Sequence, residues 1–357
     1  MKHTHPAPVV FGQFQGRPVH LVTLGRPSGL QAHIITWGGV LRDLSLPLAG
    51  GTRLPLTLGF DTFDPYPAHS PYFGAIVGRY ANRIAGGRFT HAGRAHQLDR
   101  NEAQRTTLHG GGDGFSRRIW RIDELADDSV TLGLTSADGD QGFPGTLIAT
   151  CTYTITDDHL EVKFFAETDQ PTPVNLSQHA YFNLDGGPDV RNHSLQIFAG
   201  AYTPVGPDQV PTGEILPVDD TVFDLRQPRL LRPRQSTFDH NFVLSSRLSE
   251  TDALRPAARL TSHKSGISML VQTTKPGLQL YDGHLLNVAL LGHGGRKYGR
   301  CAGLCLESQY YPDSPNQPGF PDSILLPDRD YAHRTVFSFE RQVAPNLVVS
   351  SGLHAVG

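Results

Sequence analysis

The side chains in this sequence that could do chemistry are two histidines, two carboxylates, one arginine and two amides, each set in a polar stretch between apolar residues. They are Asn82, Arg83, His109, His179, Asp239, Gln279 and Glu307. An imidazole and a carboxylate can exchange protons near neutral pH, whereas guanidinium and amide groups donate hydrogen bonds to hydroxyls. Such a set is suited to binding a polyhydroxylated ligand and to moving protons on it.

Glu307 lies in the segment CLESQYYPDSPNQPGF, from Cys305 to Phe320. The apolar start of this segment predicts a buried strand, and its Pro- and Asn-rich remainder predicts a loop. We therefore expect the carboxylate where the strand becomes a loop, held by the sheet with its tip in a cleft. Tyr310 and Tyr311 follow at once, and rings beside a carboxylate are typical of carbohydrate sites. The alternative is a solvated glutamate at a strand edge.

His179 lies in PVNLSQHAYFNL together with Asn175, Gln178 and Tyr181, and Asp239 lies in the similar stretch FDHNFVL. Polar side chains this dense inside an apolar strand are unfavourable unless they line a wet cleft or pair with one another. Both stretches therefore favour a site, and a hydrogen-bonded core histidine is the alternative for His179.

Asn82 and Arg83 lie in FGAIVGRYANRIAGGRF, whose glycines predict an irregular segment instead of a long helix. Arg83 could bind hydroxyls or a carboxylate, and a structural salt bridge fits its surroundings equally well. His109 precedes three glycines, which let a backbone approach a ligand closely, although a histidine beside glycines is usually a surface residue. No Lys-Ser or Lys-Thr pair closes that run, so it is not a phosphate-binding loop.

Strands must position these residues, because period-two alternation runs through the chain and no helical pattern of about 10 to 15 residues separates the apolar runs. Three strands in succession predict an antiparallel meander with one wet face. The expected strands cover residues 19–24, 32–46 (as one or two strands), 54–60, 130–134, 147–155, 160–166, 268–271 and 278–281. The predicted fold class is therefore all-β.

The composition agrees with many short strands and turns, because the 357 residues include 38 glycines and 27 prolines scattered between apolar runs. All-β domains often exceed the usual domain length, and no linker or internal repeat interrupts the chain. We therefore expect a single domain over residues 1–357.

Charge and cysteine content restrict the partners and the compartment. A net charge of −3 gives no general attraction to nucleic acid or to anionic membranes. We interpret the local basic cluster as a solvated loop, formed by Arg226, Arg229, Arg232 and Arg234. Three cysteines, an odd number, fit a reducing compartment, and no secretory or membrane-spanning segment is recognisable. A soluble, cytoplasmic protein is expected.

Two of the cysteines, Cys301 and Cys305, are four residues apart on an expected strand, and we interpret them as small core residues on one face. A metal or redox pair would need CxxC spacing and partner ligands. The sequence also lacks HExxH, GxSxG and a dinucleotide-binding fingerprint. No metal and no cofactor are therefore expected.

Five motifs, in order along the chain, resemble the aldose 1-epimerase (galactose mutarotase) family. They are GRYANRIAGG from Gly78, LHGG from Leu108, NLSQHAYFNL from Asn175, FDHNF from Phe238 and LESQYYPDSPNQPGFP from Leu306. With LGFDTFDPY from Leu58, the resemblance covers nearly the whole chain. It implies a large antiparallel β-sandwich, the galactose mutarotase-like supersandwich.

The resemblance also implies roles. Glu307 matches the general base that takes the proton from the C1 hydroxyl of a free aldose such as galactose or glucose, and His179 matches the general acid that protonates the ring oxygen. The ring opens, the C1–C2 bond rotates, and closure reverses both transfers. Residues that match the sugar-binding positions are Asn82, Arg83, His109, Asp239 and Gln279. A carboxylate such as Asp239 could keep His179 protonated in the resting site. We expect a monomer or homodimer that acts on this small molecule.

Three alternatives stay open. A glycoside hydrolase would pair Glu307 with Asp239 or Asp313. A hexose-6-phosphate 1-epimerase would need a cationic clamp, for which Arg117 and Arg118 are candidates. A sugar-binding module without catalysis would not need a pair of groups for proton transfer.

The chain departs from the family pattern at the expected rim of the pocket. After Gln279 it reads LYDGHLL, where many relatives have Thr and Asn in place of Asp282 and His284. A basic loop, expected to be flexible, spans residues 292–300. These differences leave the preferred sugar open.

Overall fold

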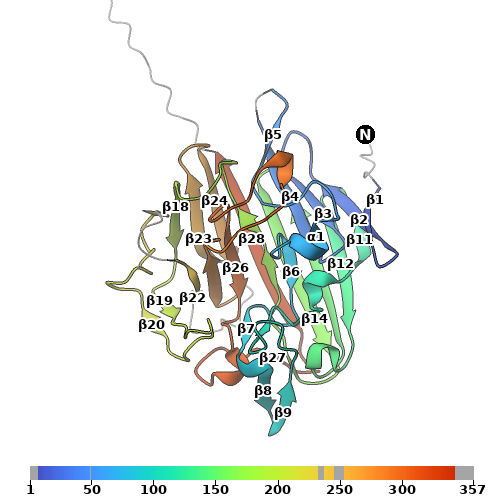
Figure 1. Cartoon of the computed structure of the whole chain (residues 1–357), viewed down its shortest axis with the longest axis vertical. Coiled ribbons are helices and arrows are strands. Elements are labelled where there is room, and N and C mark those ends of the chain that lie inside the picture. Colours follow the sequence, from blue (N-terminus) through green and yellow to red (C-terminus); the bar gives the residue numbers. More distant parts are fainter. Residues whose placement is uncertain (1–6, 49, 232–236, 245–252, 342–357) are drawn as a thin grey trace, which may run out of the picture.

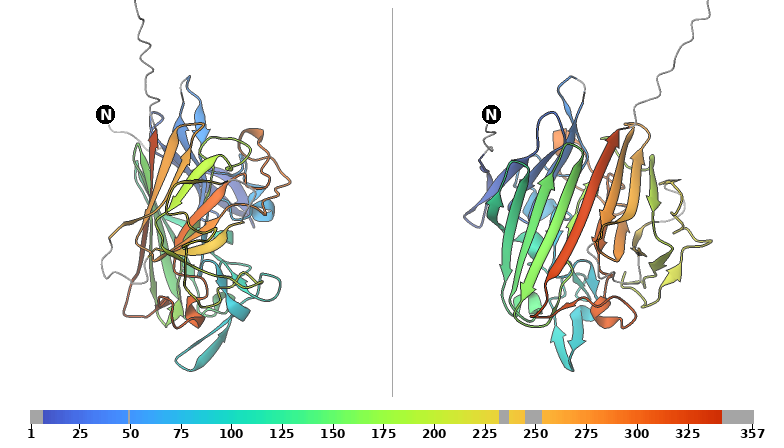
Figure 2. Two further views of the ribbon diagram at one scale, coloured as in Figure 1. Left: turned by 90° about the vertical axis from the view of Figure 1, so that its left-hand side faces the viewer. Right: turned by 180° about the vertical axis from the view of Figure 1, so that it is seen from behind.

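The computed structural model describes residues 7–48, 50–231, 237–244 and 253–341, which form an antiparallel β-sandwich. Its larger layer is a nine-stranded sheet, seen face on in the right-hand view of Figure 2. In spatial order the strands are β11 (Arg121–Leu125), β12 (Ser129–Ser136), β13 (Leu147–Ile155), β14 (His159–Thr168), β28 (Tyr331–Arg341), β24 (Ile267–Thr273), β23 (Arg255–Ser262), β18 (His193–Ile197) and β21 (Arg229–Leu230).

The second layer is a six-stranded sheet, which lies in front of the large sheet in Figure 1. In spatial order its strands are β17 (Tyr181–Phe182), β26 (Leu304–Gln309), β25 (Gly277–Tyr281), β22 (Asp239–Val243), β19 (Ala201–Thr203) and β20 (Leu216–Pro217). Every pair in it is antiparallel, so residues far apart in the sequence lie opposite one another in neighbouring strands.

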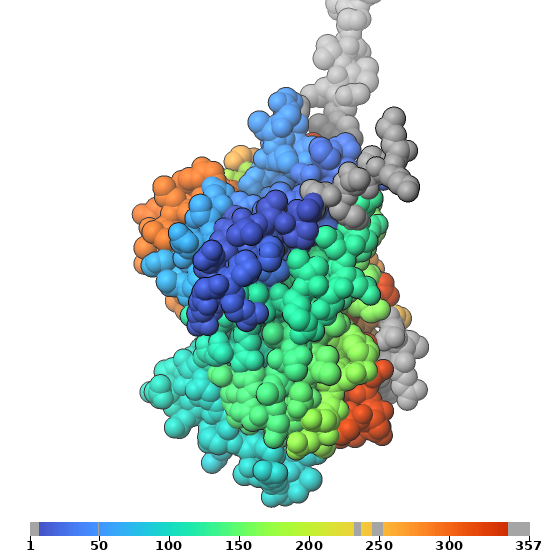
Figure 3. Space-filling model, turned by 90° about the vertical axis from the view of Figure 1, so that its right-hand side faces the viewer, coloured from blue at the N-terminus to red at the C-terminus, as the bar shows by residue number. Residues whose placement is uncertain are grey.

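The N-terminal part of the chain adds a five-stranded sheet, drawn in blue in Figure 3 against the green residues of the large sheet. Its strands are β1 (Val9–Phe14), β2 (Arg17–Leu24), β3 (Gln31–Ile35), β4 (Val40–Pro47) and β5 (Arg53–Pro55). Apolar residues of this sheet join the same core as the other two sheets, so the three sheets form one packed unit.

Short strand pairs and turns complete the described chain. β6 (Ala75–Val77) pairs with β16 (Ser177–His179), β7 (Arg83–Ile84) with β10 (Thr107–Leu108), β8 (Arg88–His91) with β9 (Arg94–Gln97), and β15 (Thr172–Pro173) with β27 (Ile324–Leu325). The helical parts are α1 (Tyr66–His69) and 3₁₀ turns at Ala85–Gly87, Phe115–Arg117, Asp140–Gly142, His293–Gly295 and Ser314–Asn316.

The main core lies between the sheets, because alternate residues of each strand point towards the opposite layer. In β26, Leu304 and Leu306 belong to the same apolar cluster as Leu278 and Leu280 of β25 and Phe337 of β28. Burying such a side chain contributes about 1.5–3 kcal/mol. This packing fixes β25 and β26, and the alternation turns their odd-numbered residues to the outer face.

The all-β prediction is confirmed, and so is the meander of β12, β13 and β14, in which Asp157 and Asp158 lie in the bend between the last two strands. The strand expected over residues 54–60 is wrong in extent. β5 ends at Pro55, and within residues 56–60 the structure has only an isolated bridge, at Thr57. Apart from that bridge, residues 56–60 have no regular secondary structure, although alternation alone would continue the strand through them.

Two local predictions are wrong. Cys301 does not share a strand face with Cys305, because it lies in a turn with φ +58° and β26 begins only three residues later. The basic loop that we expected to be flexible is anchored by the buried ring of His293. Its Nδ1 lies 2.9 Å from Asp61 Oδ1 and its Nε2 lies 2.8 Å from the carbonyl oxygen of Arg42.

The basic cluster is only partly described. Arg226 forms ion pairs with Asp219 and Asp224 on the surface, whereas Arg232 and Arg234 lie outside the described residues. In the part of the chain that the structure covers, no helix has the length and the apolar character needed to cross a membrane.

Candidate active site

Three adjacent strands bring Glu307, Gln279 and Asp239 to one face of the six-stranded sheet. Gln279 lies opposite Glu307 in the β25–β26 pair, and Asp239 lies opposite Tyr281 in the β22–β25 pair. Since residues two apart in a strand share a face, the register alone gathers two carboxylates and an amide. Glu307 lies inside β26 and not at its end as expected, because the strand continues to Gln309.

The other predicted residues reach this face from outside the six-stranded sheet. His179 ends β16, while Asn82 and Arg83 lie at the start of β7, and His109 directly follows the paired strand β10. Tyr72, Asn82 and His109 all have positive φ angles, of 65°, 63° and 52°. Such angles are strained for residues other than glycine, and they concentrate at functional sites.

His179 and Glu307 form a buried pair, with 3.7 Å between Nε2 and Oε1 and side chains only 5% and 3% exposed. Burial raises the pKa of Glu307 to about 8, helped by the charge of Asp239 and opposed by Arg83. Burial lowers the pKa of His179 to about 4, although its own backbone carbonyl and Asp239 favour the protonated ring. Near neutral pH the pair therefore holds one proton.

The expectation that Asp239 keeps His179 protonated in the resting site is therefore wrong. Asp239 acts in the expected direction, but desolvation of a fully buried imidazole outweighs it. The resting pair is a neutral imidazole beside a protonated carboxyl group.

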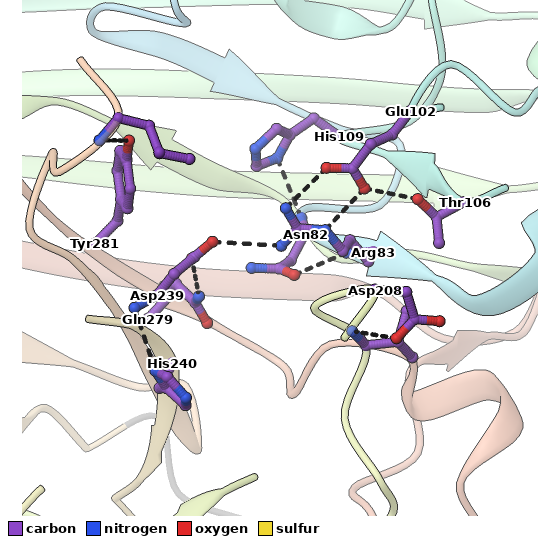
Figure 4. A network of polar contacts seen from close by, with 12 residues as sticks. Asn82, Arg83, Glu102, Thr106, His109, Asp208, Asp239, His240, Gln279 and Tyr281 are labelled. Atoms are coloured by element: carbon purple, nitrogen blue, oxygen red, sulfur yellow. Dashed lines mark hydrogen bonds and ion pairs between the residues drawn. The ribbon is translucent and has the colours of Figure 1, made fainter. Parts of the chain in front are cut away.

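Arg83 is held between two carboxylates, as Figure 4 shows. Its Nε and Nη2 donate to the two oxygens of Glu102, each at 2.8 Å, and its Nη1 lies 3.6 Å from Asp239 Oδ2. Gln279 Nε2 donates to the other oxygen of Asp239 at 2.6 Å. Both interpretations of Arg83, as a ligand-binding residue and as a member of a structural salt bridge, thus have support. Glu102 anchors one side of its guanidinium, and the other side faces Asp239 in the site.

His109 has a defined tautomer when its ring is neutral. The backbone N–H of Asn82 donates to its Nδ1 at 3.1 Å, so the ring proton must lie on Nε2. Burial lowers the pKa of His109 well below its usual value, and the charges of His179 and Arg83 lower it further. His109 is therefore a neutral hydrogen-bond donor at the site.

Proximity alone would allow His109, His179 and Glu307 to hold a metal ion, since their ligand atoms lie within 4.8 Å of one another. A histidine that binds a metal usually donates its other ring N–H to an acceptor. His109 does the opposite, because its Nδ1 accepts a hydrogen bond from the backbone N–H of Asn82. The donor set therefore fits a metal poorly.

Aromatic rings fix the two histidines. The ring of Tyr72 stacks on that of His179, with centroids 5.6 Å apart, and meets that of His109 edge-on at 4.7 Å. Tyr181 packs on His179 from β17 at 5.1 Å. These contacts limit rotation of the two imidazoles.

The expectation that Tyr310 and Tyr311 flank the carboxylate is wrong. Tyr311 packs edge-on against Phe320 at 5.3 Å, in a small separate cluster, and Tyr310 packs against Tyr331 at 6.4 Å. The chain turns away from the site after β26 ends, so neighbours of Glu307 in sequence are not its neighbours in space.

All seven predicted residues belong to one connected group. Hydrogen bonds, ion pairs and strand pairing connect each residue to the next in the following spatial order: His109, Asn82, Arg83, Asp239, Gln279, Glu307 and His179. The sequence interpretation missed Glu102 and Tyr72. Glu102 lies seven residues before His109, in a stretch whose glycines gave the only signal. Tyr72 directly follows a segment rich in Pro and aromatics, residues 61–71, which gave no other signal.

The arginine doublet does not form the clamp suggested for a phosphate. Arg118 donates to both oxygens of Asp140, each at 2.6 Å, and Arg117 donates to the carbonyl oxygen of Pro67 at 3.1 Å. A guanidinium that is already satisfied by a carboxylate has little left to offer a phosphate group.

Comparison with known proteins gives a consistent result. The family model described as Aldose 1-epimerase matches residues 20–338. Galactose mutarotase from Mus musculus is 41% identical over 321 residues, which cover 88% of this chain and 92% of the relative. Aldose 1-epimerase from Escherichia coli (strain K12) is 37% identical over 337 residues, which cover 91% and 96%.

Solved structures agree with these relatives. An aldose epimerase homologue from C. elegans superimposes with a TM-score of 0.83 at 31% identity, over 90% of this chain and 99% of that one. A galactose 1-epimerase from Lactobacillus acidophilus gives a TM-score of 0.78 at 25% identity, over 93% and 98%. The likeness therefore extends over the complete sandwich.

Proposed function

Because this chain belongs to the aldose 1-epimerase family and is a mutarotase, we propose that it interconverts the α and β anomers of free galactose and glucose with Glu307 and His179 as its proton-transfer pair. The single observation that carries the assignment of residues is the buried pair itself, with 3.7 Å between His179 Nε2 and Glu307 Oε1. At this separation the two groups can each reach one of the two oxygens bonded to C1, the hydroxyl oxygen and the ring oxygen.

In the opening step, Glu307 removes the proton from the C1 hydroxyl. The electron pair of the broken O–H bond then forms the second C1–O bond of the carbonyl group. The C1–ring oxygen bond breaks at the same time, and the ring oxygen takes the proton from His179 Nε2. After rotation about the C1–C2 bond, the same two transfers run backwards and close the ring on the other face. No atom is gained or lost, and the chemistry needs no redox partner.

This step requires an ionised Glu307 and a protonated His179. The resting pair carries the same single proton, on the carboxyl group in place of the imidazole. Movement of that proton from Glu307 to His179 therefore prepares the pair without exchange with solvent. A bound sugar stabilises the charged form, because its hydroxyls replace part of the hydration that burial removes.

The surrounding residues are proposed to hold the sugar. Arg83 and His109 supply donors for its oxygens, since the guanidinium is anchored by Glu102 and the imidazole keeps its proton on Nε2. Gln279 Oε1 and Glu307 Oε2 are buried acceptors without a hydrogen-bond partner among the described residues. Buried acceptors normally have a donor, and sugar hydroxyls would supply one.

The alternative reactions have less support. Of the two carboxylates considered as the second group of a hydrolase, Asp313 is engaged by the backbone N–H of Ala85 and by the amides of Asn316 and Gln317. Asp239 is engaged by Gln279 and Arg83. Of the two arginines considered as phosphate ligands, Arg118 is engaged by Asp140 and Arg117 donates to the carbonyl oxygen of Pro67. Mutarotation of an unphosphorylated sugar is the reaction that agrees with these contacts.

Polarimetry of freshly dissolved sugars tests the proposal. We expect the enzyme to accelerate the change in rotation of α-D-galactose and α-D-glucose far above the buffer rate. Methyl α-D-galactoside should give no change, because it lacks the C1 hydroxyl proton, and galactose 6-phosphate should react poorly. Release of methanol from the glycoside, or faster reaction of the phosphate ester than of galactose, would contradict the proposal.

A further inference from the structure

Cys305 lies directly beneath the proposed acid. It precedes Glu307 by two residues in β26, so both side chains are on the same face. Tyr181 of β17 and Tyr281 of β25 lie opposite it in the two neighbouring strands. The thiol is completely buried, and its Sγ lies 3.5 Å from Nδ1 of His179.

The contact matters because the two ring nitrogens of His179 have different tasks. Nε2 faces Glu307 and the position of the sugar, whereas Nδ1 faces the sulfur. The protonated ring carries two N–H donors, and a buried donor without an acceptor is costly. Cys305 Sγ is the side-chain atom that Nδ1 meets among the described residues, and it can act as a weak acceptor.

The chemical nature of this acceptor affects the strength of the acid. A carboxylate bonded to Nδ1 stabilises an imidazolium and makes it a weaker acid. Cys305 does not supply such a charge, because burial raises the pKa of its thiol well above the usual value. The charges of Glu307 and Asp239 raise this pKa further. A neutral sulfur therefore orients the ring and leaves the imidazolium able to protonate a weakly basic ring oxygen.

We propose that Cys305 is a positioning residue for mutarotation, whose sulfur accepts the Nδ1–H of His179 and thereby directs Nε2 to the sugar. The inference rests on the proposed role of His179, and it adds a residue that the predicted site did not include. It explains why a cysteine, and not a larger apolar residue, lies between two tyrosines at this point of the sheet.

Three variants separate positioning from packing. Cys305→Ala removes the side-chain acceptor, and Cys305→Ser restores one of similar size. Cys151→Ala is the matched control, because Cys151 is equally buried but lies in β13 of the large sheet, within the main core. We expect Cys305→Ala to lower kcat about tenfold with KM nearly unchanged, as for loss of a partner to one buried donor. Cys305→Ser should return kcat to within about threefold of wild type, and Cys151→Ala should keep wild-type kcat.

Nitrogen-15 NMR of the His179 ring supplies a readout that altered packing would not move. In the wild type at neutral pH we expect the proton on Nδ1, and in Cys305→Ala a shift towards the Nε2–H tautomer. The same tautomer in both proteins, or equal kcat in Cys305→Ala and Cys151→Ala, would overturn the inference. Full activity of His179→Asn would instead refute the proposed acid, whatever the Cys305 variants do.

Discussion

At the scale of single residues, the proposed mechanism depends on two groups whose pKa values burial has moved in opposite directions. Glu307 keeps its proton to about pH 8, whereas His179 gains one only near pH 4. The site therefore contains one proton over a wide interval, which is what a reversible exchange between two oxygens of a sugar needs. Below that interval the pair has no base, and above it the pair has no acid.

The pH dependence of the rate follows from this proton count. We expect kcat/KM to be bell-shaped, falling below about pH 4 and above about pH 8. The measurement is the enzyme-dependent polarimetric rate at each pH, after subtraction of the rate in buffer alone. A limb near pH 6.5, the ordinary value for a histidine, would show that His179 is not desolvated as described.

The predictable part of the site was the list of residue types. Polar residues inside apolar strands are costly, so His179 and Asp239 stood out without any structure. The protonation of His179 was predicted wrongly, because the sequence shows the neighbouring carboxylate but not the completeness of burial. Its partners Tyr72 and Cys305 were not predicted either, since aromatic and sulfur side chains are ordinary in a core.

At the scale of elements, the antiparallel register does most of the positioning. β22, β25 and β26 each contribute one group to a single row, and β7 and β10 bring Arg83 and His109 over it. The short strand β7 has only two residues, so its arginine needs further support. Glu102 supplies that support through two hydrogen bonds to the guanidinium.

Replacement of this support should weaken sugar binding without removing the proton-transfer pair. We expect Glu102→Gln to raise KM about tenfold with a smaller change in kcat, because charge-assisted hydrogen bonds to Arg83 become neutral ones. Initial rates over a range of galactose concentrations measure both constants.

The matched control is Glu161→Gln, which removes a comparable ion pair with Arg334 on the large sheet. If both variants change KM equally, the effect is general and not a consequence of anchoring Arg83.

Sequence alternation predicted the long strands well and the short ones poorly. β12, β13 and β14 each have eight residues or more, and their period is unmistakable. β6, β7, β10 and β16 have two or three residues each, too few to show a period, and tertiary pairing defines them. The segments that complete the site are therefore those that a sequence reveals least.

At the scale of the whole molecule, the sandwich supports a buried carboxyl group that lowers its stability at high pH. The unfolded chain loses the Glu307 proton near pH 4.5, whereas the folded protein retains it to about pH 8. The folded state thus binds more protons across this interval, and stability must fall as the pH rises through it. Above about pH 8 the loss is complete.

Glu307→Gln should remove this penalty. We expect the variant to be more stable than the wild type, with a difference in the free energy of unfolding that grows from about pH 5 to about pH 8 and is constant above it. Urea denaturation at several pH values measures the difference, and contributions from His179 and other groups cancel between the two proteins. A difference that is independent of pH would contradict the raised pKa.

The fold as a whole was predictable from the sequence for a physical reason. Two large sheets need many alternating runs and many turns, and 65 glycines and prolines spread along 357 residues indicate that pattern. How the sheets pack against each other could not be predicted from this pattern, because leucines of β25 and β26 contact Phe337 of β28 only in the folded protein. Resemblance to a family supplied what alternation could not.

One measurement tests the central claim most directly. Polarimetry of fresh α-D-galactose at pH 7 compares the wild type, Glu307→Gln and His179→Asn at equal concentration, with circular dichroism to verify folding. We expect each variant to lose at least about 100-fold in kcat, since general acid–base catalysis contributes on this scale. A folded variant that retains the wild-type rate would show that its residue does not transfer the proton, and the assignment of the pair would be wrong.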